Sequence, residues 1–145
     1  MWYSKILVAY DGSKPADKAV SIATQMAEAN PEANLTFVHV LKIVDCGAGN
    51  FSLNQAACSN AKEIGVKLEG IVKTFGDRAE TRLLKGSSPA DLIVRCSEEE
   101  GCDVIVMGSR GMGGVKGYLG SVSTAVLRES RVCVVIAKTD QAERS

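Results

Sequence analysis

A stretch rich in glycine and serine, late in the chain, has the residue types of a phosphate-binding loop. It begins with Gly108-Ser109-Arg110-Gly111, directly after the apolar run 104–107, and ends at Gly120-Ser121. The apolar run predicts a buried strand that ends in a tight turn. Glycine lets a backbone approach a ligand closely because it has no Cβ, and a helical spacing of apolar residues follows Ser121. Because free N–H groups at a helix start bind anions, the stretch predicts a phosphate cradle.

The glycine spacing matches neither of two common phosphate-binding motifs. A dinucleotide fingerprint needs G-x-G-x-x-G after the first strand, whereas Gly111 and Gly113 are followed by Lys116 at the third glycine position. A P-loop needs Gly-Lys-Ser or Gly-Lys-Thr, which the sequence lacks. The glycines alone therefore predict an anion site without identifying its ligand.

Apolar runs and helical stripes alternate along the chain and must position this loop. Strands are predicted at 5–10, 35–41, 79–85, 103–107 and 132–137, and helical stripes at 16–27, 57–75, 89–100 and 120–129. Residues 45–50 are predicted to form a loop. Ser13 is a predicted helix cap, and Ser88-Pro89-Ala90-Asp91 has the form of a capping box. The alternation predicts an α/β fold, with one domain over residues 1–145 built on an open parallel sheet.

Three segments that are distant in the sequence end at the same edge of this predicted sheet. Asp11, Val40 and Gly108 each lie at the carboxyl end of a strand. In open parallel sheets, ligands bind at this edge where the strand order reverses. We therefore expect these three residues to border one crevice.

Composition excludes several function classes. Seventeen basic residues balance seventeen acidic ones, which does not favour non-specific binding to nucleic acid or membrane surfaces. No apolar run approaches the roughly 20 residues of a membrane helix, so a soluble protein is expected. The five cysteines form no C-x-x-C pair, and we expect free thiols in a reducing cytoplasm.

Four segments together resemble the universal stress protein family. They are Val8-Ala9-Tyr10-Asp11-Gly12-Ser13, Val38-His39-Val40, Gly86 with Ser88-Pro89-Ala90, and the late glycine motif. ATP-binding members carry G-x-x-G, nine residues and G-[ST], while the spacer here, Met112 to Leu119, has eight residues. The resemblance implies a Rossmann-like sheet of order 3-2-1-4-5 with helices on both faces. It also implies ATP as ligand, with any Mg²⁺ carried on the triphosphate, and a homodimer formed through the fifth strand, 132–137.

The resemblance also assigns binding residues. It implies Asp11 near the adenosine and the Val40 backbone against adenine. Along ribose and phosphates it implies Gly108, Arg110, Gly111, Gly120, Ser121 and Val122. Two alternatives stay open from the residues themselves: Asp11 as a turn-forming residue and Arg110 as a solvated loop residue.

Catalytic and metal-binding residues are not expected. His39, the sole histidine, alternates with valines and is interpreted as a packed, hydrogen-bonded strand residue rather than a base. The cysteines are scattered rather than clustered as metal ligands, and no serine lies in a G-x-S-x-G context.

Three functions remain to be distinguished. The leading hypothesis is an ATP-binding stress or signalling module whose nucleotide biases a dimer or an unidentified protein partner. The second is a slow ATPase or nucleotidyl-transfer enzyme, against which the absence of an evident activating group argues. The third is a protein-interaction module of the same fold that has lost nucleotide binding, which the eight-residue spacer keeps open.

Overall fold

Five parallel strands form the central sheet of the structure, a computed structural model that describes residues 1–47, 50–52, 55–110 and 119–139. The strands are β1 (Lys5–Ala9), β2 (Asn34–Lys42), β5 (Ala79–Gly86), β6 (Val104–Gly108) and β7 (Cys133–Ala137). Their spatial order is β5-β2-β1-β6-β7, and every neighbouring pair is parallel. The predicted α/β class and the strand order 3-2-1-4-5 are therefore confirmed.

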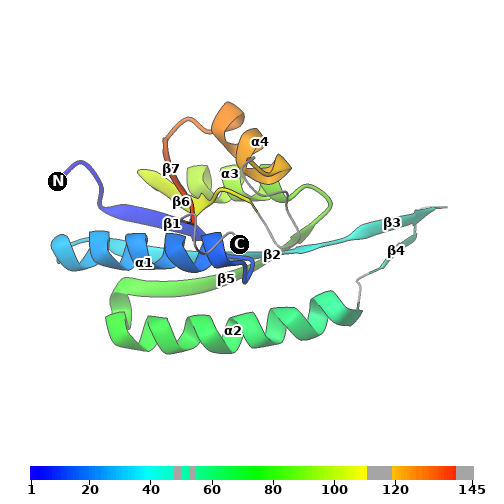
Figure 1. The fold of residues 1–145 in the computed structure, drawn as a ribbon, viewed down its shortest axis with the longest axis horizontal. Helices are drawn as coiled ribbons and strands as arrows, with labels where there is room; N and C mark the ends of the chain where they lie inside the picture. The colour runs from blue at the N-terminus through cyan, green and yellow to red at the C-terminus, as the bar shows by residue number, and fades with distance from the viewer. Residues whose placement is uncertain (48–49, 53–54, 111–118, 140–145) are drawn as a thin grey trace.

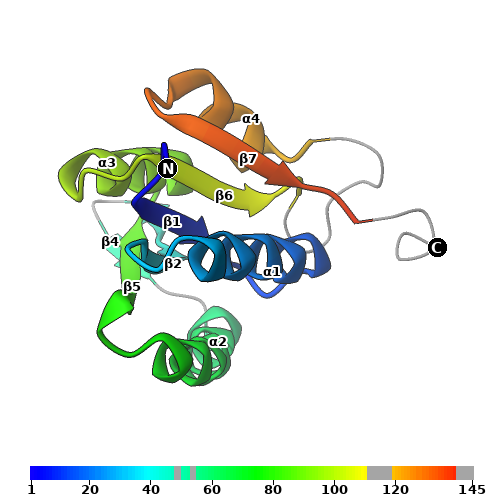
Figure 2. The same ribbon diagram turned by 90° about the vertical axis from the view of Figure 1, so that its left-hand side faces the viewer.

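Helices cover both faces of this sheet. On one face lie α1 (Lys14–Ala29) and α2 (Gln55–Phe75), and on the other lie α3 (Pro89–Glu99) and α4 (Ser121–Glu129) (Figures 1 and 2). A 3₁₀ turn, η1 (Gly76–Arg78), connects α2 to β5. Because both faces are covered, β1 and β6 are almost entirely apolar instead of alternating between apolar and polar residues.

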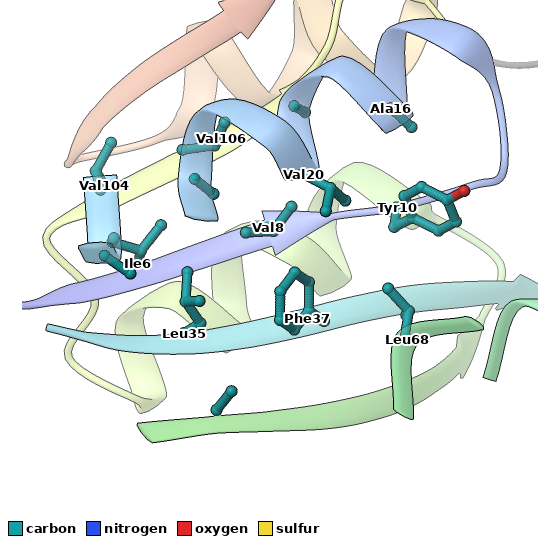
Figure 3. Close-up of a cluster of buried hydrophobic side chains, with 14 of the residues drawn as sticks. Ile6, Val8, Tyr10, Ala16, Val20, Leu35, Phe37, Leu68, Val104 and Val106 are labelled. Atoms are coloured by element: carbon teal, nitrogen blue, oxygen red, sulfur yellow. The ribbon is translucent and has the colours of Figure 1, made fainter. Parts of the chain in front are cut away.

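Two separate clusters of buried side chains fill the layers between sheet and helices. Beneath α1 and α2 the strands contribute residues such as Ile6, Val8 and Phe37, all fully buried (Figure 3). Beneath α3 and α4 they contribute the alternate residues, including Leu7 and Val38. β1 therefore belongs to both clusters, and its carboxyl end is held from two sides.

The helix ends show which sequence signals form hydrogen bonds. The Ser13 hydroxyl accepts from the Ala16 N–H (3.2 Å) and caps α1, as predicted. Ser88 occupies the cap position of α3, but its side chain makes no cap hydrogen bond, so the predicted capping box is wrong. The backbone differs between the two cap positions, since φ and ψ are −74° and 163° at Ser13 but −122° and 97° at Ser88.

The segment predicted as a loop at 45–50 contains two short strands instead. β3 (Val44–Gly47) and β4 (Asn50–Ser52) pair antiparallel and extend from the end of β2 (Figure 1). Asp, Gly and Asn residues favour turns locally. The β3–β4 pair depends on cross-strand hydrogen bonds, and the segment has no periodic apolar pattern from which these strands could be predicted.

Candidate functional site

A cleft of about 390 Å³ opens at the carboxyl ends of β1, β2 and β6. From β1 the chain proceeds outward to β2 and β5 and then crosses back to β6 on the other side of β1, so the cleft lies where the strand order reverses. Its lining comes from the ends of these three strands, the residues that follow them and the starts of three helices: Ala9, Tyr10, Asp11, Ala16, Val38, Val40, Pro89, Ile93, Met107, Gly108, Arg110, Gly120, Ser121, Val122 and Ser123.

Seven of the eight predicted binding residues line this cleft. They are Asp11, Val40, Gly108, Arg110, Gly120, Ser121 and Val122. The eighth, Gly111, lies outside the described residues, as do residues 112–118 of the spacer. The expected meeting of three strand ends is therefore observed.

The inner wall of the cleft is apolar. Val38 and Val40 of β2 lie on it together with Met107 of β6, and Ile93 of α3 faces them. These side chains belong to, or pack against, the cluster beneath α3 and α4. The flat face of an aromatic ring can bury apolar surface against these side chains.

The outer rim carries one acidic and one basic side chain, Asp11 and Arg110. The Asp11 carboxylate accepts from the Ser13 N–H (2.9 Å), so the turn-forming role that the sequence left open is present. This bond uses one oxygen, and among the described residues the other oxygen has no hydrogen-bond partner and could accept from a ligand hydroxyl. Arg110 is half-buried on the same rim, and its carbonyl accepts from the Ser13 hydroxyl (3.4 Å).

The N-terminus of α4 borders the cleft and lacks a side-chain cap in the described part of the chain. Its cap residue is Gly120, which has no side chain to accept from the first-turn amides, and within the described residues no side-chain cap hydrogen bond is present. The residues of that first turn, Ser121 to Ser123, all line the cleft. Unsatisfied N–H groups and the positive end of the helix dipole favour an anion at this position.

Gly108 is required by packing at least as much as by ligand approach. A Cβ built on it would lie 2.8 Å from the Pro15 carbonyl carbon, the Ala16 nitrogen and the Pro15 Cβ. The substituent would therefore enter the first turn of α1, on the face of β6 opposite α3 and α4. The glycine allows α1 to start directly against the end of β6.

Ser123 is a cleft residue that sequence reasoning did not select. Its buried hydroxyl lies 2.9 Å from the Gly108 carbonyl oxygen and 3.0 Å from that of Ser109, which shares its single proton between two acceptors. The Gly120 N–H donates to the Ser109 carbonyl as well (2.8 Å). These bonds fix the start of α4 against the end of β6. A serine at an otherwise apolar inward position of the helix was the available signal.

A polar cluster behind the cleft fixes the side chain of Tyr10. Its hydroxyl donates to Asp17 (2.5 Å) and accepts from Lys67 (2.8 Å), and Lys67 pairs with Asp17 at 2.7 Å. Burial raises the pKa of the Tyr10 phenol, and the Asp17 carboxylate raises it further while Lys67 opposes the change. The hydrogen bond to Asp17 is the main cause that raises the pKa of Lys67. Tyr10 is therefore a neutral donor that links α1 to α2.

Two other site types are not found in the described part of the chain. No group of three or more His, Cys, Asp or Glu side chains there could hold a metal ion. None of its helices is long and apolar enough to cross a membrane.

Comparisons with known proteins agree on one family. The model of the universal stress protein family matches residues 3–138. A Thermus aquaticus protein, named universal stress protein in QAH/OAS sulfhydrylase 3'region, is 33% identical over 94% of this chain and 99% of its own.

Two solved structures are similar to the whole chain. The Archaeoglobus fulgidus universal stress protein in complex with dAMP has a TM-score of 0.71 at 27% identity, covering 95% of this chain and 100% of that one. A universal stress protein in complex with cAMP has a TM-score of 0.68 at 27% identity, covering 95% and 98%. The cleft, the strand order and the family model lead to one conclusion: this chain belongs to the universal stress protein family.

Proposed function

We propose that the cleft binds an adenine nucleotide, with ATP as the ligand. The observation that carries the proposal is the pairing of an apolar wall with an uncapped helix start in one cleft of about 390 Å³. The wall suits a base, and the α4 start suits phosphate. The two similar solved structures hold dAMP and cAMP, which supports an adenine nucleotide.

The rim residues have distinct roles in this proposal. The free carboxylate oxygen of Asp11 accepts from a ribose hydroxyl, and the Ser121 hydroxyl donates to a phosphate oxygen. Arg110 adds a positive charge beside the phosphates, which shortens and strengthens the hydrogen bonds it donates. Gly111 keeps its proposed place on the phosphate side. Mg²⁺ binds through the triphosphate rather than through a cluster of protein ligands.

Calorimetric titration with ATP and Mg²⁺ tests the site when two pairs of matched variants accompany the parent. Val40→Trp fills the apolar wall, whereas Val66→Trp makes the same change at a position on α2 that is 72% exposed. Arg110→Ala removes the rim cation, whereas Arg128→Ala removes a cation from the exposed side of α4.

We expect binding in the parent and in both control variants. Val40→Trp should abolish it, and Arg110→Ala should weaken it about tenfold, the loss of one charge-assisted hydrogen bond. Parent protein that does not bind at millimolar ATP overturns the proposal and favours the protein-interaction module. Equal binding by Val40→Trp and parent places the nucleotide elsewhere.

We propose, secondly, that the chain forms a homodimer through β7. β7 is an edge strand, and its residues Val134 to Ile136 are only partly buried. An apolar edge of this kind is an aggregation hazard unless another strand covers it. Sedimentation equilibrium should give twice the mass of one chain, and Val135→Lys should lower it. A parent protein that stays monomeric at high concentration contradicts this arrangement.

We propose further that the bound nucleotide biases formation of the dimer or binding of a partner protein. The free thiols of Cys58, Cys96, Cys102 and Cys133 suit a protein of the reducing cytoplasm.

A further inference from the structure

The hydrogen-bond ladder between β1 and β2 ends at Tyr10, the residue before Asp11. The Tyr10 N–H donates to the Val38 carbonyl (2.8 Å), which continues the pattern of the sheet. The next acceptor along β1 is the Tyr10 carbonyl, and it lies 2.8 Å from Nδ1 of His39. In the described part of the chain, no backbone N–H takes this position instead. A side chain therefore completes the ladder where the two strands separate around the cleft.

The acceptor defines the protonation of the imidazole ring. A carbonyl oxygen has no proton to donate, so Nδ1 of His39 must carry the hydrogen. In the neutral ring this leaves Nε2 without a proton. The geometry thus selects the Nδ1–H tautomer.

His39 and the ligand-facing residues lie on opposite faces of β2. Side chains alternate along a strand, and Phe37, two residues earlier, belongs to the cluster beneath α1 and α2. Val38 and Val40 line the cleft on the other face. The Tyr10 carbonyl and the Asp11 nitrogen are parts of one planar peptide unit. The ring of His39 therefore holds from behind the peptide that carries Asp11 into the cleft.

The other contacts of Tyr10 do not replace this bond. Asp17 and Lys67 hold its phenol oxygen, which lies at the far end of the side chain. The Val38 carbonyl holds the peptide on the N-terminal side of Tyr10. The orientation of the following peptide, and with it the starting direction of Asp11, depends on His39 and on the Ser13 N–H bond to the Asp11 carboxylate.

We propose that His39 is a positioning residue for the nucleotide site, acting through its Nδ1–H bond to the Tyr10 carbonyl. This inference rests on the proposed adenine-nucleotide function and assigns to it a residue that does not touch the ligand. Without the bond, the peptide between Tyr10 and Asp11 can rotate, and Asp11 loses its alignment with the ligand.

Nuclear magnetic resonance of the ring nitrogens tests the bond itself. The chain has one histidine, so a long-range ¹H–¹⁵N spectrum of uniformly labelled protein contains a single imidazole. At pH 8, we expect the pattern of the Nδ1–H tautomer, with the proton-bearing nitrogen assigned to Nδ1. A pattern with the proton on Nε2 overturns the proposal, since that ring cannot donate to the Tyr10 carbonyl.

Three substitutions test the effect on binding. The His39→Asn variant carries an amide NH₂ group at the same number of bonds from Cβ as Nδ1, whereas His39→Gln moves this donor one bond further and His39→Leu has no donor. Calorimetric titration with ATP and Mg²⁺ should give near-parental affinity for His39→Asn. Affinity about three- to tenfold weaker is expected for His39→Gln and His39→Leu, the range of one hydrogen bond. Thermal unfolding of each variant identifies the temperature range in which all are folded.

The outcomes separate this inference from the proposed function. Equal affinity of His39→Leu and parent overturns the positioning role while leaving nucleotide binding in place. Equal weakening of all three variants also overturns it, because a general loss of packing at this position does not distinguish donor from non-donor. Parent protein that binds no nucleotide overturns the proposed function and this inference together.

Discussion

Substitution of Gly108 by alanine should destabilise the protein whether or not a nucleotide is bound. The added methyl would lie 2.8 Å from the Pro15 carbonyl carbon and from the Ala16 nitrogen. Real Cβ atoms do not approach other heavy atoms this closely, and the neighbours are backbone atoms of the first turn of α1 rather than a flexible side-chain end. The end of β6 and the start of α1 must therefore move apart.

The size of the effect follows from the contacts that this movement disturbs. Overpacking in a well-packed interior costs about 1–3 kcal/mol. For a chain of this length that corresponds to a fall in Tm of about 3–9 °C. Ala16 and Gly108 both line the cleft, so the same movement should also weaken nucleotide binding.

Urea unfolding followed by circular dichroism measures this cost, with Gly70→Ala as the matched control. A Cβ on Gly70 meets nothing within 4 Å, and the residue is in the interior of α2. Alanine there should stabilise the protein by up to about 1 kcal/mol, because glycine is a poor helix former. The reasoning is refuted when Gly108→Ala unfolds at the same urea concentration as the parent, since α1 would then not be packed against β6 as described.

Three further predictions concern other parts of the fold. Ser123→Ala removes a buried donor that lies 2.9 Å from the Gly108 carbonyl oxygen. We expect the free energy of unfolding in urea to fall by about 1–2 kcal/mol and nucleotide binding to weaken. Unchanged stability would contradict the role of this hydroxyl in fixing α4. The carboxylate of Asp103 accepts from the Ser4 N–H (2.7 Å) and from the Lys5 N–H (3.0 Å), and these hydrogen bonds lower its pKa below the ordinary value of about 3.9. The carboxylate therefore stabilises the fold above the unfolded pKa, and this contribution is lost as pH falls through the lower folded pKa. Asp103→Asn should therefore be less stable at pH 7 and lose less stability than the parent on acidification, and parallel pH profiles of unfolding would disprove this. Burial raises the pKa of the Cys102 thiol to about 11, so iodoacetamide at pH 8 should modify the exposed Cys133 first. Mass spectrometry of peptides measures the order of labelling, and faster labelling of Cys102 would contradict its burial.

Residues at strand ends were the part of the site that the sequence could predict. Asp11, Val40 and Gly108 follow apolar runs, and parallel strands bring their carboxyl ends to one edge. The strand order could not be predicted from the local pattern, because alternating strands and helices permit several orders. It was implied by the family resemblance instead.

The residues that sequence reasoning missed depend on tertiary contacts. Ile93 and Pro89 enter the cleft because α3 packs beside α4, a relation between helices that local periodicity does not contain. The bonds of Ser123 join it to residues 14 and 15 positions earlier. Gly108 was predicted for ligand approach, whereas its contact with α1 is a packing relation across more than ninety residues of chain.

For His39, the local sequence pattern predicted that the side chain is hydrogen-bonded but not which atom it bonds. Alternation with two valines predicted a packed, hydrogen-bonded strand residue, and the bond to the Tyr10 carbonyl confirms that interpretation. The partner could not be predicted, because it lies 29 residues earlier, at the point where the neighbouring strand leaves the sheet.

Amide chemical-shift mapping during a titration with ATP and Mg²⁺ tests the central claim most directly, because it reports binding and its location together. We predict saturable shifts for Asp11, Val40 and the first turn of α4, and unchanged signals for Gly65 and Val66 on α2. No shifts at millimolar ATP, or shifts confined to residues outside the cleft, would contradict the assignment of this cleft as a nucleotide site.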